Sequence, residues 1–167
     1  MLASFFKKSK PINFLIVGVF MAIYFIMANF FKNNEILSWQ YIGKKIGYLI
    51  TYLLVMVILN FIVKRNGISK KNTFTIFIFG IITMLLLPVL KADELFISAL
   101  FVLLALRRVI SLKSGLEIKK KIFDASLWVG VASLFYPLSI YFLILPFVGI
   151  FYFLHLLFSD HWFSSNL

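Results

Sequence analysis

The sequence predicts an all-α integral membrane helical bundle, with about six transmembrane helices in a single domain that covers residues 1–167. Three observations predict this class. Hydrophobic residues make up 62% of the chain and charged residues only 14%, whereas soluble domains use apolar residues at about half of their positions. The apolar residues gather in runs long enough to cross a bilayer. The Lys and Arg residues stand in short tracts between these runs, where lipid headgroups lie.

The six expected spans follow the apolar runs. They cover residues 12–31, 46–63, 73–90, 91–108, 122–136 and 138–158. The first run is uncharged over twenty residues, and at about 1.5 Å per residue it crosses a hydrocarbon core of about 30 Å. Pro11 suits the first turn of this helix, because its missing N–H would be unpaired there in any case. Residues 32–45 are expected to form a polar connector, with Trp39 and Tyr41 at the headgroup level.

The fourth span is short, because its uninterrupted apolar part, residues 95–106, has only twelve residues. It reaches the length of a bilayer only if the charged residues at both ends extend toward water. Asp93 and Glu94 then lie in the first turn of the helix and Arg107 and Arg108 in the last, which is the arrangement that the helix dipole favours.

The last apolar run, residues 122–158, is too long for one crossing. Pro137 is expected to divide it into two spans, because proline breaks or kinks a helix. A re-entrant pair that does not fully cross the membrane is the alternative.

Loop charges predict the orientation of the chain. Thirteen basic residues fall on the side that holds the N-terminus and residues 107–121, and four fall on the other side. Because basic loops stay in the cytoplasm, the N-terminus and the 107–121 loop are expected to be cytoplasmic. The net charge of +11 therefore indicates anionic lipid headgroups as partners, and we expect no nucleic-acid partner.

The longest polar interruption, residues 107–124, holds the densest positive charge. Its candidate anionic-lipid-binding residues are Arg107, Arg108, Lys119, Lys120 and Lys121. Arginine and lysine hold phosphate groups, and arginine does so with two parallel hydrogen bonds. Apolar residues alternate with the basic ones, so this segment is expected to form a short helix in the headgroup layer, broken at Gly115. The alternative is that these cations only fix the topology.

Three carboxylates form a second candidate group. Asp124 lies one turn inside the fifth span, where it could hold a metal-bound phosphate or relay a proton. The alternative is a carboxylate at a helix start, stabilised by the dipole and by Lys120. Asp93 and Glu94 lie on the opposite side, where they could supply a general base or bind a divalent cation, and simple first-turn caps are the alternative.

Cofactors and reaction are not indicated by any motif. The chain has no cysteine, which excludes disulfides and thiolate metal sites. His155 and His161 are six residues apart, which does not align two ligands on one helix, so we expect no metal site. We find no phosphate-binding Gly loop and no hydrolase nucleophile motif, so the question of enzymatic activity stays open.

The stretches 4–14, 103–114, 119–125 and 128–135 carry a family resemblance. They include Phe-Phe-Lys-Lys-Ser-Lys-Pro, Leu-Arg-Arg-Val-Ile-Ser-Leu-Lys-Ser and Lys-Lys-Lys-Ile-Phe-Asp-Ala, and they resemble an uncharacterised bacterial family of multi-pass inner-membrane proteins. The resemblance covers most of the chain up to about Tyr136. It implies a helical membrane fold and a bacterial inner (plasma) membrane location, and it implies no activity. Members of that family continue with further spans, so the chain resembles their N-terminal part.

Two function classes follow. The first is a cell-envelope biogenesis protein that handles an anionic or polyisoprenyl-phosphate-linked lipid, with the 107–121 loop holding the headgroup. The second is a non-enzymatic structural subunit of a larger membrane complex. The small-x-x-x-small spacings Gly43 to Gly47 and Ser126 to Gly130 let helices approach closely, within the bundle or against a partner membrane protein. A transporter is a weaker third class, because few polar residues would face the interior.

Overall fold

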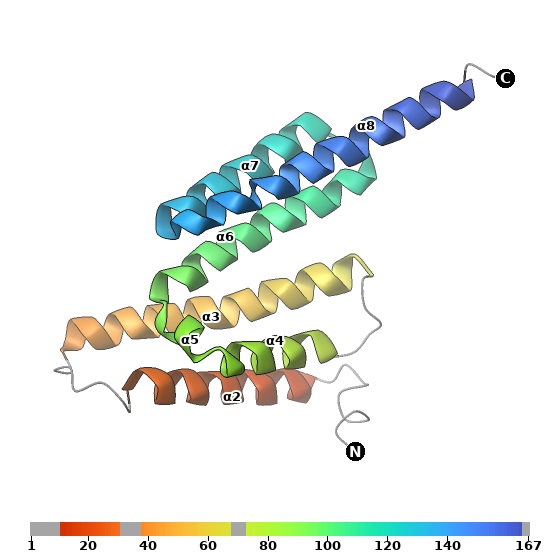
Figure 1. The fold of residues 1–167 in the computed structure, drawn as a ribbon. Helices are drawn as coiled ribbons and strands as arrows, with labels where there is room; N and C mark the ends of the chain where they lie inside the picture. The colour runs from red at the N-terminus through yellow and green to blue at the C-terminus, as the bar shows by residue number, and fades with distance from the viewer. Residues whose placement is uncertain (1–10, 31–37, 68–72, 165–167) are drawn as a thin grey trace. The chain divides into compact units, whose positions relative to one another are not determined.

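The computed structural model describes residues 11–30, 38–67 and 73–164, and all regular elements in these ranges are helices (Figure 1). They are α2 (Pro11–Phe30), α3 (Trp39–Arg65), α4 (Phe74–Leu85), α5 (Leu87–Lys91), α6 (Asp93–Ile110), the 3₁₀ helix η1 (Ser111–Ser114), α7 (Ile118–Phe135), the 3₁₀ helix η2 (Pro137–Leu143) and α8 (Ile144–Ser164). The predicted all-α class is confirmed.

Four helical segments of the described ranges are long and apolar enough to cross a membrane. They are Ile12–Asn29, Trp39–Arg65, Asp93–Ser114 and Pro137–Leu154. These segments support the predicted membrane class by length and composition, and six crossings remain a prediction. Several residues that entered the charge count lie outside the described ranges: Lys7, Lys8, Lys10, Lys32, Lys70 and Lys71.

The second helix begins earlier than the sequence predicted. α3 starts at Trp39 rather than at residue 46, because the Ser38 hydroxyl accepts a hydrogen bond from the backbone N–H of Tyr41 at 3.2 Å and caps the helix. Of the expected connector, residues 32–37 lie outside the described ranges. The aromatic residues expected in a loop therefore lie on the first turn of a long helix.

The third apolar run is interrupted. In place of one helix over residues 73–90, α4 ends at Leu85 and α5 begins at Leu87, with Leu86 at φ −97° and ψ 68° between them. Pro88 explains the break, because it has no N–H to donate to the carbonyl four residues earlier, and it lies instead in the first turn of α5, where a proline is tolerated.

The chain divides into two compact units, Met1–Leu100 and Phe101–Leu167. In the first unit, α4 lies beside α2 and α3 (Figure 1). α4 contacts α2 at Gly80, where a Cβ would lie 3.4 Å from Val17 and 3.6 Å from Met21, in ordinary van der Waals contact. Phe25, Tyr52 and Phe96 pack together at the centre, with ring centroids 4.8 to 6.1 Å apart.

One face of α2 forms the largest part of this core. Its buried residues recur every four positions: Asn13, Val17, Met21, Phe25 and Asn29. Residues four apart lie on the same face of an α-helix, so this stripe is the contact face of α2. The opposite face is apolar and exposed, as expected of a helix surrounded by lipid.

The second unit contains the end of α6, η1, α7, η2 and α8. Phe101 stacks on Trp128 and Phe135 with centroids 5.6 and 5.7 Å away, so α6 lies against α7. After the break at Pro137, η2 and α8 return along α7 (Figure 1). Small buried residues, among them Ala125 and Ala132, allow the helices to approach closely.

Candidate functional site

A tight turn joins α6 to α7 and carries most of the predicted cationic residues. α6 continues into η1, and the chain reverses at Gly115, whose φ of 68° is accessible to glycine without steric cost. The break expected at Gly115 is therefore present. The single headgroup-layer helix expected over residues 107–121 is not, because α6 and α7 extend into both ends of that range.

Two contacts hold this turn in place. The ammonium group of Lys121 donates hydrogen bonds to the Ser111 carbonyl at 2.9 Å and to the Ser114 hydroxyl at 2.6 Å. Leu112 is buried against α8, where a Cβ on Gly149 would lie 2.6 Å from its Cδ1 atom. The absence of a side chain at Gly149 thus creates the space that Leu112 fills. Lys121, which the sequence predicts as a lipid ligand, holds the turn closed through these two hydrogen bonds.

The predicted cations have different surroundings. Arg108 forms a 3.1 Å ion pair with Asp124, although the sequence had paired Asp124 with Lys120. Lys120 lies 3.6 Å from Glu117, one turn away. Each acid of the turn is thus paired with a nearby base. Arg107 and Lys119 are exposed, and so is Lys113, which the sequence analysis did not single out.

The tip of the turn is apolar and strained. Leu116 is 70% exposed between basic residues, which is the pattern of a side chain that inserts into the headgroup layer. Glu117 adopts a left-handed backbone conformation with φ 50°, which costs a residue with a Cβ roughly 1 kcal/mol or more. Both residues lie beside the basic surface formed by Arg107, Lys113, Lys119 and Lys120, which we call the basic turn.

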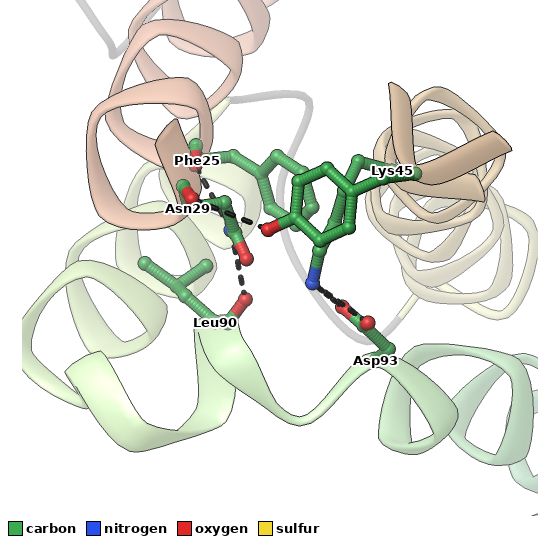
Figure 2. Close-up of polar contacts among 6 residues, drawn as sticks. Phe25, Asn29, Lys45, Leu90 and Asp93 are labelled. Atoms are coloured by element: carbon green, nitrogen blue, oxygen red, sulfur yellow. Dashed lines mark hydrogen bonds and ion pairs between the residues drawn. The ribbon is translucent and has the colours of Figure 1, made fainter. Parts of the chain in front are cut away.

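A second polar cluster lies in the first unit, where α2, α3, α5 and α6 meet (Figure 2). Lys45 of α3 donates to both carboxylate oxygens of Asp93, each at 2.7 Å, and its side chain is only 8% exposed. Asp93 is the first residue of α6, so its negative charge also lies at the positive end of the helix dipole. We call this group, with Tyr41 and Asn29, the Lys45–Asp93 cluster.

Asn29 completes the cluster and joins two helices. Its amide donates to the Phe25 carbonyl at 3.0 Å and to the Leu90 carbonyl at 3.2 Å (Figure 2). The hydroxyl of Tyr41 reaches the Asn29 carbonyl at 3.5 Å, and the Lys45 ammonium lies 5.5 Å from the centre of the Tyr41 ring. Tyr41 and Lys45 both come from the segment that the sequence analysis treated as a connector.

The three predicted carboxylates, Asp93, Glu94 and Asp124, therefore have different surroundings. Asp93 forms an ion pair with the Lys45 ammonium group through both carboxylate oxygens. Glu94 beside it is exposed. Asp124 belongs to the turn in the second unit. Among the described residues no group of three or more His, Cys, Asp or Glu residues could hold a metal ion, and the side chains of His155, Asp160 and His161 lie outside that description.

Sequence reasoning missed the polar residues on buried helix faces. Asn13 and Asn29 are buried on α2, and Thr83 of α4 hydrogen-bonds with the Tyr52 hydroxyl. Asn60 of α3 was also passed over. Polar side chains are rare in transmembrane segments and usually face the protein interior, so their positions alone were a usable signal.

Fold and site define a class, an all-helical protein with several apolar helices able to cross a membrane and a basic turn at the end of one of them. No family model, curated protein or solved structure matches this chain.

Proposed function

We propose that this protein binds an anionic lipid headgroup at the basic turn and acts in cell-envelope biogenesis, on an anionic or polyisoprenyl-phosphate-linked lipid. The observation that carries the proposal is the pairing pattern of the turn. Both of its acids, Asp124 and Glu117, are paired with a base of the same turn, and Lys113 and Lys119 remain exposed beside Leu116. An exposed leucine among cations fits a surface that contacts lipid.

The topology that belongs with this proposal has six crossings and a cytoplasmic N-terminus in a bacterial inner membrane. The crossings are α2, α3, α4 with α5, α6, α7, and η2 with α8. The segment from Phe74 to Lys91 has 18 residues, enough for a crossing when tilt and local thinning of the bilayer are included. The basic turn then lies at the cytoplasmic surface, where anionic lipids attract Lys and Arg.

The topology is directly testable because the chain has no cysteine. Single cysteines at Lys113 and at Gln40, in the first turn of α3, report the accessibility of each position to a membrane-impermeant maleimide in intact cells and in inverted vesicles. The proposal requires Gln40→Cys to react from outside and Lys113→Cys only in inverted vesicles. The reverse pattern, or reaction of both from one side, would overturn it.

Lipid binding is tested with the purified chain in nanodiscs that contain increasing fractions of an anionic phospholipid. The double variant Lys113→Gln and Lys119→Gln removes two cations that have no ion pair among the described residues. At about 1 kcal/mol per basic residue near an anionic surface, it is expected to weaken binding by ten- to thirtyfold. Lys44→Gln is a matched control, because Lys44 is an exposed lysine at the start of α3. Equal binding by all three proteins would refute the proposal.

The second candidate function, a non-enzymatic subunit of a larger membrane complex, rests on a different observation. A Cβ built on Gly43, Gly47 or Gly130 meets no atom of the described residues within 4 Å. These three glycines therefore face open space among those residues, which suits close contact with a partner helix. This alternative predicts that Gly47→Leu or Gly130→Leu abolishes co-purification of a partner in mild detergent and leaves the isolated chain folded.

A further inference from the structure

A groove between α2 and α3 has the chemistry of a lipid-binding site. Its volume is about 450 Å³, and its lining residues come from both helices: Phe14, Val57, Asn60, Phe61, Lys64 and Arg65. Three of these side chains are purely apolar. The cations lie together at the C-terminal end of α3, where the helix dipole also favours an interaction with positive charge.

At the charged end of the groove, an aromatic side chain holds one of the two cations in position. The Arg65 guanidinium lies over the Phe61 ring, 5.6 Å from its centre, so the aromatic side chain supports the arginine. Lys64 is the adjacent residue. Two neighbouring cations above an apolar wall match a phosphate group with a hydrocarbon chain attached, because each part of such a molecule meets its complement.

Asn60 adds a more specific requirement. Its Oδ1 atom is buried and accepts no hydrogen bond from the part of the chain that the structure describes. An unsatisfied buried polar atom costs about 1 to 3 kcal/mol, so an unoccupied acceptor on a groove wall calls for a donor. Asn60 itself lines the groove, and its amide torsion has broad minima, so rotation about that torsion can present the oxygen to a bound ligand.

The position of Asn60 selects among lipids. It lies one helical turn before Lys64, about 6 Å deeper along α3, and therefore on the chain side of a phosphate bound by Lys64 and Arg65. Diacyl phospholipids carry only ester acceptors at that level. A monoacyl phospholipid carries a free glycerol hydroxyl there, and that hydroxyl can donate to the Asn60 oxygen.

We infer that the α2–α3 groove binds an anionic monoacyl phospholipid, with its phosphate on Lys64 and Arg65, its acyl chain along Phe14, Val57 and Phe61, and its glycerol hydroxyl on Asn60. This site lies in the first unit and uses none of the residues of the basic turn. It is independent of the proposed function.

The test uses the full chain in phosphatidylcholine vesicles with a photoactivatable lysophosphatidylglycerol whose diazirine is on the acyl chain. The expected result is labelling of α2 and α3 peptides around Phe14, Val57 and Phe61, with unlabelled lysophosphatidylglycerol as an effective competitor. Diacyl phosphatidylglycerol has the same headgroup and lacks the free hydroxyl on the glycerol that carries the acyl chain. Lysophosphatidylcholine has that free hydroxyl and lacks net charge. Each is expected to compete at least fivefold less well.

Variants separate the three contacts. Asn60→Leu keeps the shape of the side chain and removes the acceptor, and it is expected to weaken labelling about fivefold, as the loss of one hydrogen bond does. Asn60→Gln keeps an amide and is expected to recover part of that loss. Arg65→Gln is expected to cost about tenfold. Lys44→Gln, at the other end of α3, should label like the wild type.

Two results would overturn the inference. Equal competition by diacyl phosphatidylglycerol would remove the argument from the Asn60 hydroxyl contact. Wild-type labelling of both Asn60→Leu and Arg65→Gln, or labelling confined to α6 and α7 peptides, would show that the groove is not the site. Far-UV circular dichroism and gel filtration of each variant distinguish loss of binding from loss of fold.

Discussion

Replacement of Lys45 by methionine tests whether the Lys45–Asp93 cluster stabilises the first unit. The change removes the ammonium group and keeps most of the aliphatic stem, so packing along α3 is largely preserved. Asp93 then loses the only ion pair that it forms among the described residues. Its side chain is only 19% exposed, so water compensates the charge of the carboxylate only in part.

The magnitude follows from two opposing terms. Two unit charges 2.7 Å apart attract by about 6 kcal/mol at an effective dielectric constant of about 20, but removal of both ions from water costs several kcal/mol each. Breaking a fully buried pair by removing one partner costs about 3 to 5 kcal/mol. Because Asp93 retains some access to water, we expect Lys45→Met to lower the free energy of unfolding by about 2 to 3 kcal/mol.

The assay is reversible unfolding in mixed micelles by titration with sodium dodecyl sulfate, followed by far-UV circular dichroism. The double variant Lys45→Met and Asp93→Leu removes both charges and is expected to lose less stability than Lys45→Met alone, because no uncompensated ion remains. Lys44→Met is the matched control. Lys44 is exposed and lies 5.7 Å over the Tyr48 ring, so its loss is expected to cost less than about 1 kcal/mol.

The reasoning is refuted if Lys45→Met and Lys44→Met have the same effect. It is also refuted if the loss of stability of the double variant equals the sum of the losses of Lys45→Met and Asp93→Leu measured separately. Additive losses mean that the Lys45 and Asp93 side chains do not interact.

Two further changes test other contacts. Gly149→Leu is expected to displace Leu112, to lower the free energy of unfolding by about 1 to 3 kcal/mol and to abolish anionic-lipid binding at the basic turn. Gly130→Leu is the control, because a side chain there meets open space and should be neutral in the same unfolding and nanodisc assays. Equal effects of the two variants would contradict the packing of Leu112 against Gly149. Asn29→Leu leaves the Leu90 carbonyl without its donor and is expected to cost about 1 to 3 kcal/mol of unfolding free energy, so an unchanged titration midpoint would show that this hydrogen bond contributes nothing.

Helix type and several helix ends were predictable because single residues dictate them. Pro11 opens α2, the acids at the start of α6 complement its dipole, and Pro137 ends α7. The turn at Gly115 likewise follows from the backbone freedom of glycine. The break at Leu86 was predictable in principle, since Pro88 has no N–H to donate to the preceding turn. The sequence predicted one unbroken span over residues 73–90 because Pro88 lies near its end, where a helix can tolerate a proline.

The contact faces of the helices were not predictable from hydropathy. In a membrane both faces of α2 are apolar, so the pattern that separates core from surface in a soluble helix is missing. The polar residues Asn13 and Asn29 mark the buried stripe, and they were the available signal. A search for polar positions within the spans would have located it.

The candidate site was predictable only in part, because ion pairs join residues far apart in the sequence. Lys45 and Asp93 are 48 residues apart, and the charge count had used Lys45 only to assign topology. The predicted topology placed both residues on one side of the membrane, which was a reason to consider them partners. Helical spacing suggested Lys120 as the partner of Asp124, whereas in the structure the turn brings Arg108 to within 3.1 Å of Asp124.

The broken third run has a consequence for membrane insertion of the nascent chain. α4 has 12 residues and rises about 18 Å, which is too short to remain alone in a bilayer of about 30 Å. The Leu90 carbonyl beyond the break receives its hydrogen bond from Asn29, on a helix synthesised some sixty residues earlier. In the six-crossing topology proposed above, the translocon has to keep α2 beside the α4–α5 segment, and we expect these two segments to enter the lipid as a pair and not one after the other.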